Sequence, residues 1–200
     1  MNKNQDKCHI HHQVKERTMR QNRNEGRTSK THVFIQPNIG LDSEARESVI
    51  EILNINLADV AVFTLKIYSA QWNMRGAGFL DLRALFNQQA QQLMTLWMKM
   101  AERAGILGGN PICSLEEFLH FARIEEQPGS APDILRLLAD QEAAIRFLRE
   151  DVRKCGLEYE DEGTADLLIR VMVLYEKMAW MLRSYLETES KHLEPHISDE

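Results

Sequence analysis

The chain of 200 residues has few cysteines and no evident membrane or export signal. Its three cysteines are far apart and form no CxxC pair, which excludes a disulfide framework and indicates a reducing compartment. No uninterrupted apolar run of about 18 residues is evident, and the first residues lack the apolar core of a signal peptide. We therefore expect a soluble, cytoplasmic protein without a membrane partner.

Positive charge is concentrated near the N-terminus. Residues 1–33 have eight basic and three acidic side chains, although the whole chain carries a net charge of −6. A segment this polar cannot bury enough apolar surface to offset the entropy lost on ordering, so we predict that residues 1–37 form a disordered arm. Its basic residues are candidates for contacts with DNA phosphates: Lys3, Lys7, Lys15, Arg17, Arg20, Arg23, Arg27 and Lys30.

The rest of the chain contains helical patterns and no alternating strand pattern. Apolar residues at intervals of three and four predict long helices over 43–71, 79–107, 132–155 and 164–186. Ser114 and Glu117 have the spacing of a capping box, which predicts a short helix between the second and third long ones. The predicted fold is all-α, a four-helix bundle at residues 38–188, followed by a polar tail at 189–200.

The first long helix has apolar residues on more than one face. Val49, Leu53 and Leu57 belong to one stripe, and Val62 and Leu65 belong to a second. Because a helix with two apolar faces usually packs on its own bundle and on a neighbour, this pattern favours an oligomer. Six methionines at helical spacing are expected in the core: Met94, Met98, Met100, Met172, Met178 and Met181.

Two motifs connect this bundle to a known family. WNMRGAGF at residues 72–79 is followed by MAERAGILGG at 100–109, and PNIGL precedes the first helix at 37–41. With these motifs, residues 38–188 closely resemble the Dps family (DNA-binding proteins from starved cells), which are small ferritins. The resemblance implies a ferritin-like fold, a twelve-subunit shell, oxidation and storage of ferrous iron, and in many members DNA binding through a basic tail.

The resemblance also implies where iron would be oxidised, at a two-fold interface between subunits. The family's ligand positions, two His and an Asp from one subunit and an Asp and a Glu from its partner, fall here on Gln71, Arg83, Asn87, Met98 and Glu102. Four of these five differ from the expected ligands, and arginine cannot ligate a metal. We predict that iron oxidation at this site is lost and that Arg83 pairs with Glu102 of the partner subunit.

Other residues with metal-binding chemistry lie near the two ends of the chain. Cys8, His9, His11 and His12 could take zinc or copper, or could be a His-rich segment without a ligand. His192, Glu194 and His196 leave the same two alternatives open, and Glu102 is a weaker candidate ligand.

Two functions remain open from the sequence. The first is a non-catalytic Dps-like shell that acts in DNA binding and protection, stress or iron homeostasis through its basic arm. The alternative is a ferroxidase and iron-storage protein with an altered metal site that uses Glu102. Assembly with Dps paralogues is compatible with either function.

Overall fold

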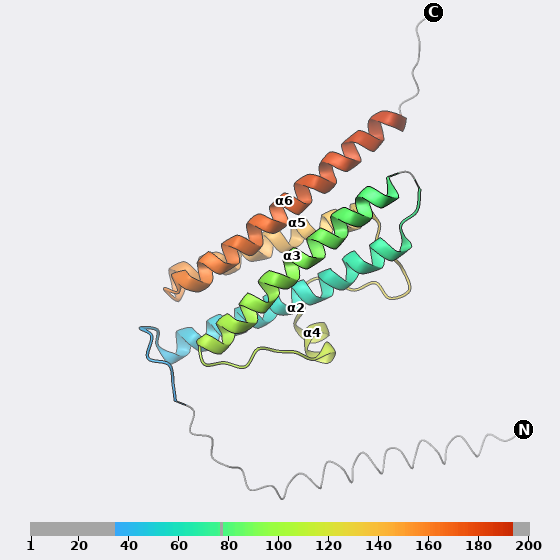
Figure 1. The fold of residues 1–200 in the computed structure, drawn as a ribbon. Helices are drawn as coiled ribbons and strands as arrows, with labels where there is room; N and C mark the ends of the chain where they lie inside the picture. Colours follow the sequence, from blue (N-terminus) through green and yellow to red (C-terminus); the bar gives the residue numbers. More distant parts are fainter. Residues whose placement is uncertain (1–34, 77, 194–200) are drawn as a thin grey trace, which may run out of the picture. The chain divides into compact units, whose positions relative to one another are not determined.

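The computed structural model describes residues 35–76 and 78–193. Contacts divide the chain into the units Met1–Ile35 and Gln36–Glu200, and the fold described below is that of the second unit. It has four long α-helices: α2 (Ser43–Asn73), α3 (Phe79–Ile106), α5 (Ile134–Arg153) and α6 (Glu162–Leu193). A short helix, α4 (Leu115–Phe121), lies between α3 and α5, and a wide π-helical turn, η1 (Lys154–Glu158), continues α5 (Figure 1). The described residues contain no strand, which confirms the predicted all-α fold.

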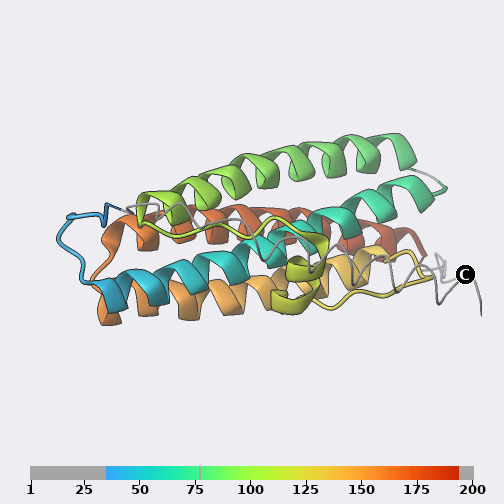
Figure 2. The ribbon, with the colours of Figure 1, turned by 90° about the horizontal axis from the view of Figure 1, so that it is seen from below.

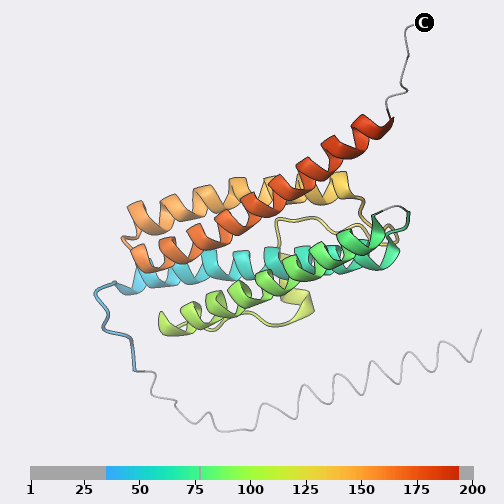
Figure 3. The same cartoon turned by 45° about the horizontal axis from the view of Figure 1, so that its top comes forward.

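The long helices form two antiparallel pairs that lie along a common direction (Figures 1 and 2). The α2–α3 pair is linked by a tight turn, and α5 packs along α6. Two hydrogen bonds set the register of α2 against α3: Trp97 Nε1 donates to the Leu57 carbonyl oxygen at 3.0 Å, and Gln71 Nε2 donates to that of Arg83 at 3.1 Å. Helix α4 packs on α2 (Figure 3). It also contacts α3 through the edge-on rings of Trp97 and Phe118.

Side-chain caps mark where α2, α4 and α5 begin. Asp42 caps α2 by accepting a hydrogen bond from the backbone N–H of Ala45 at 2.7 Å, as expected of an aspartate at this position. The predicted capping box of Ser114 and Glu117 is present at α4. The expectation that the next helix starts at Pro132 is wrong by two residues, because the Asp133 side chain caps Arg136 N and so places the first helical residue at Ile134.

The end of α3 requires glycine for two separate reasons. Gly108 has a φ of +89°, which side-chain-bearing residues rarely adopt. At Gly109, a Cβ atom would lie 2.6 Å from Cδ1 of Ile50, so the α3 terminus can approach α2 only without a side chain there. The LGG sequence therefore fixes how closely these two helices pack.

Helix α2 is the central element of the core. Leu53, Leu57 and Phe63 are fully buried, and the Phe63 ring lies 5.4 Å from that of Tyr175 on α6. Among the described helices, α2 is also long and apolar enough to cross a membrane by length and composition, with 61% of that stretch buried in the bundle. The stretch is not an uninterrupted apolar run, because the buried polar residues Asn56 and Asp59 lie within it, and most of it is covered by the other helices of the bundle.

An ionic cluster fastens the segment after α4 to the bundle. The Arg123 guanidinium lies within 2.9 Å of both Asp59 on α2 and Asp151 on α5, and Asn56 also donates to Asp151 at 2.7 Å. Burial raises the pKa of Asp59, and Arg123 offsets part of this rise. We call Asn56, Asp59, Arg123 and Asp151 the Arg123 cluster. Since its charges come from three parts of the chain, it fixes the crossover between the two helix pairs.

Candidate functional site

The structure brings Gln71, Arg83 and Asn87 together where α2 ends and α3 begins. They line an open pocket of about 690 Å³, whose other walls are Tyr68, Trp72, Leu80 and Ala84. Gln71 is buried, and its amide nitrogen is committed to the Arg83 carbonyl oxygen. This contact is possible because α3 runs antiparallel to α2 only a few residues after α2 ends.

Aromatic and charged side chains give the pocket its character. The rings of Tyr68 and Trp72 are stacked with centroids 6.0 Å apart, and Trp72 is 73% exposed. Arg83 is exposed, and its guanidinium carbon lies 5.9 Å from the centre of the Phe79 ring, at the outer limit of a cation–π contact. A large apolar ring beside a cation that no described carboxylate neutralises is unusual for a surface exposed only to solvent, and it indicates a surface that binds another molecule.

Met98 and Glu102 are not part of this pocket. Arg83 and Glu102 are 19 positions apart on α3, which corresponds to roughly 28 Å along a straight α-helix. Both are exposed. Within one chain the five predicted positions therefore form two separate groups, and only a second molecule could unite them.

The side chains at these positions do not suit iron. Iron favours carboxylate oxygens supported by imidazole, whereas the first group offers two neutral amides and a permanent cation, and the second a thioether and one carboxylate. The Gln71 amide is already hydrogen-bonded, and Arg83 would repel a metal cation. The described part of the chain contains no group of three or more His, Cys, Asp or Glu side chains that could hold a metal ion.

One face of α3 connects the two groups. Its members are all exposed and follow each other at intervals of three or four residues: Leu80, Arg83, Asn87, Gln91, Met94, Met98 and Glu102. We call this face the α3 stripe. The expectation that Met94 and Met98 are core residues is wrong, because they are 37% and 52% exposed, whereas Met100 and Met178 are buried. Helical spacing alone does not distinguish an inner apolar face from an outer one.

The other candidate residues contribute less. The arm residues and the Cys8–His12 cluster lie outside the described residues, as do Glu194 and His196, and the side chain of His192 is not described. His120 is exposed on α4, with its ring edge-on to Phe121 at 4.9 Å.

Comparison with known proteins agrees with this geometry. The model of the ferritin-like domain family matches residues 50–191, so the chain belongs to the ferritin-like proteins. Within them it belongs to the Dps family: it is 33% identical over 141 residues to the DNA protection during starvation protein of Listeria innocua, which covers 68% of this chain and 90% of that protein. A low temperature-induced protein of Nostoc sp. is 40% identical to this chain over 154 residues, and the match covers 75% of this chain and 86% of that protein.

Solved structures show the same fold. A Dps protein from Vibrio cholerae, described as a member of a broad superfamily of ferritin-like diiron-carboxylate proteins, superposes with a TM-score of 0.69 at 28% identity. The match covers 76% of this chain and 96% of that protein. DpsC from Streptomyces coelicolor gives a TM-score of 0.71 at 27% identity, covering 76% and 90% of the two chains.

Proposed function

We propose that this chain is the subunit of a cytoplasmic Dps-type shell that does not oxidise iron at the usual interface site. Its role is in DNA protection and the stress response, with attachment to DNA through the basic arm. The observation that carries the proposal is the set of side chains at the candidate site, where two amides, a thioether and an arginine stand in place of iron ligands. Family membership supports the shell, and the exposed α3 stripe supports the contact between subunits.

The α3 stripe is complementary to itself. If two copies of α3 lie antiparallel about a two-fold axis near Gln91 and Met94, residues on either side of the axis face each other. The register that places Arg83 opposite the partner's Glu102 also places Asn87 opposite the partner's Met98 and Gln91 opposite the partner's Met94. One register thus aligns opposite charges at both ends of the stripe and places each methionine opposite an amide side chain between them, as an isologous contact allows.

In this contact the arginine takes the place of the metal. A guanidinium binds a carboxylate through two parallel hydrogen bonds, so Arg83 and the partner's Glu102 neutralise each other where the family would bind cations. Exposed Trp72 and Leu80 lie beside Arg83 and would become buried in the same contact. The twelve-subunit shell therefore forms without iron at this position.

Reversal of the two charges tests this contact. Arg83→Glu places two acids opposite each other, and Glu102→Arg places two arginines opposite each other, so each variant should weaken the dimer by at least tenfold. The double variant restores opposite charges and should recover most of the affinity. Sedimentation measures the change. If the loss of dimer affinity in the double variant equals the sum of the losses in the single variants, the two residues do not contact each other.

Iron oxidation distinguishes this proposal from the alternative enzyme. In stopped-flow experiments with less than one ferrous ion per subunit, we expect no fast phase of iron oxidation whose amplitude scales with the number of subunits. A fast phase that disappears in Glu102→Ala would support a ferroxidase with an altered site. The matched control is Glu116→Ala, an exposed acid on α4 outside the stripe.

The proposed DNA contact depends on the arm. Eight basic residues on each of twelve arms would give a multivalent, strongly salt-dependent attachment to phosphate, because each neutralised phosphate releases a bound counterion. In a gel-shift experiment, removal of residues 1–33 should abolish binding while leaving the shell intact. Unchanged binding by the truncated shell would refute the role of the arm.

A further inference from the structure

The centre of the bundle contains polar side chains that the described protein atoms leave without hydrogen bonds. Each long helix supplies one: Thr64 from α2, Gln89 from α3, Gln141 from α5 and Tyr175 from α6. None is more than 4% exposed. In both amide groups the oxygen and the nitrogen lack a hydrogen-bond partner, and the two hydroxyl oxygens lack one as well. Unsatisfied polar atoms in a protein interior are rare and costly, so these four side chains need a partner.

Helix register places these four side chains at one level of the bundle. The hydrogen bonds between α2 and α3 put Gln89 opposite Leu65, one residue from Thr64. The ion pair of Lys66 with Asp140 puts Gln141 at the same level on α5. The Tyr175 ring lies 5.4 Å from that of Phe63, the residue before Thr64. We call Thr64, Gln89, Gln141 and Tyr175 the polar layer.

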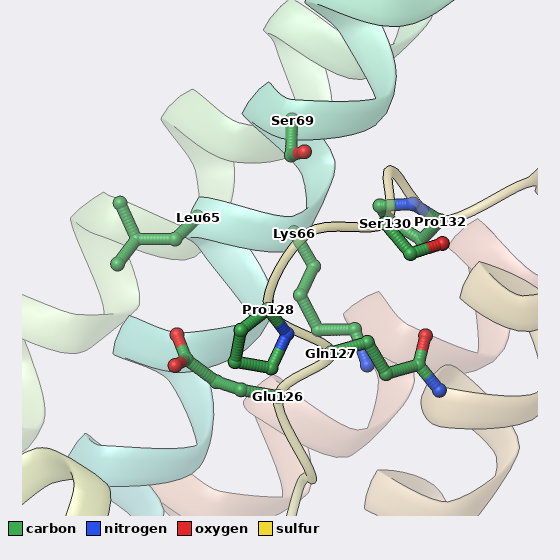
Figure 4. A pocket seen from close by; sticks show the side chains of 8 residues that line it. All are labelled: Leu65, Lys66, Ser69, Glu126, Gln127, Pro128, Ser130 and Pro132. Carbon is green, nitrogen blue, oxygen red and sulfur yellow. The ribbon is translucent and has the colours of Figure 1, made fainter.

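A surface pocket lies at the level of this layer along α2, since Leu65 and Lys66 line it. It has a volume of about 210 Å³ and is formed by α2 and the segment before α5, with Lys66, Gln127 and Ser130 among its walls (Figure 4). The Lys66 side chain extends from α2 toward Gln127 (Figure 4), donates to the Glu125 carbonyl oxygen at 2.8 Å and pairs with buried Asp140. Lys66 thus spans from the pocket to the level of the polar layer.

Charge identifies the ligand that this layer can take. The two carboxylates nearest it are already paired, Asp140 with Lys66 and Asp59 with Arg123, which leaves no free negative charge to compensate a metal ion. Lys66 and Arg123, the described cations that pair with these carboxylates, are likewise neutralised, so an anion would find no free positive charge there. The remaining groups are neutral and offer both donors and acceptors, which is the environment that holds buried water.

We propose that the polar layer binds ordered water that bridges the four long helices and exchanges with solvent past Lys66. Each water accepts from one side chain and donates to another, so the amides and hydroxyls are satisfied without direct contact. The bundle then has a hydrated centre between apolar layers. This site is separate from the α3 stripe and does not depend on it.

Crystal structures of the full chain and of two variants test this. In the wild type, ordered water should lie about 2.7–3.2 Å from the Gln89 or Gln141 amide and bridge to a second member of the layer. Gln141→Leu, which removes the amide at similar volume, should lose that water and lower the melting temperature by roughly 2–8 °C. The matched control is Gln88→Leu, the same change at an exposed position of α3, which should keep the water and move the melting temperature little.

Two results would overturn the proposal. One is a dry layer in which the two amides and hydroxyls bond directly to one another. The other is density with an anomalous signal and contacts of about 2.0–2.4 Å, which would identify a metal ion. If Gln141→Leu does not fold, the wild-type and control structures still decide between these outcomes.

Discussion

The side chains of Arg123 and Arg83 have opposite environments in the same bundle. The Arg123 side chain is 26% exposed, and two buried carboxylates contact it from different helices. Arg83 is exposed, and no carboxylate pairs with it among the described residues of its own chain. The chain therefore completes its interior charges by itself and presents the charges of the α3 stripe outward. This difference separates what one chain needs in order to fold from what it offers to a second copy.

The largest loss of stability is expected when Arg123, the cationic partner of the buried carboxylates, is removed. Arg123→Ala would leave Asp59 and Asp151 buried without their cation, which should lower the free energy of unfolding by about 3–5 kcal/mol. Denaturant titration at one fixed protein concentration measures this. Arg149→Ala is the control, because it breaks an exposed pair with Glu176 and should cost less than about 1 kcal/mol. Equal losses in the two variants would contradict the contrast between interior and surface arginines.

The same variant should show a characteristic pH dependence. Burial already raises the pKa of Asp59, and loss of Arg123 removes the charge that lowers it, so this pKa should rise further. A group whose pKa is higher in the folded state contributes stability below its unfolded pKa and loses it as pH rises. The deficit of Arg123→Ala against wild type should therefore shrink as the pH falls from about 7 toward 4. A deficit that grows in acid would contradict this assignment.

A like charge near the proposed two-fold axis should affect assembly rather than folding. Met94→Lys places a lysine on each copy close to the axis, which should weaken the dimer by about 2 kcal/mol, or roughly 30-fold in its dissociation constant. Circular dichroism should be unchanged, because Met94 is 37% exposed. Gln88→Lys adds the same charge outside the stripe and should leave the dimer intact. A similar loss in both variants would argue for a general charge effect.

A smaller effect is expected at α4, which packs on α2 and contacts α3 through Phe118. Ser114→Ala removes the hydroxyl that caps Glu117 N and should cost about 1 kcal/mol. Hydrogen exchange should accelerate within α4, while α5 and α6 stay protected. The Glu117→Gln variant keeps the Ser114 cap and should have a milder effect. Exchange that accelerates throughout the bundle would mean that α4 is not an independent unit.

The smallest expected effect concerns the reactivity of the Cys155 thiol and should not change the free energy of unfolding. Burial raises the pKa of the Cys155 thiol to about 12, and the charges of Asp151 and Asp161 add to the rise. Since the thiolate is the reactive form, Cys155 should resist alkylation at neutral pH in the folded protein, whereas exposed Cys113 should react. Mass spectrometry of the peptides after labelling distinguishes the two. Modification of Cys155 before Cys113 would show that η1 opens readily.

The sequence predicted the helices better than it predicted their surroundings. Periodicity and capping residues located α2, α3 and α4 closely, because those signals are local. It missed the wide turn η1, where backbone geometry carries the helix past Gly156. It also missed the Arg123 cluster, because Asp59, Arg123 and Asp151 are brought together only by the packing of separate helices. The same limit applies to Met94 and Met98, whose spacing suits either side of a helix.

The α3 stripe has a consequence for how such a subunit changes over generations. If the proposed two-fold contact forms, both of its sides come from one gene, so a single codon change at Arg83 would alter two positions in every dimer at once. A mixed dimer with a relative that keeps metal ligands would have two unlike halves, one containing Arg83 and the other containing Glu102 beside the relative's ligands. The number of complete metal sites in a mixed shell would then depend on the ratio of the two gene products, because each subunit of this chain removes ligands from the sites it shares.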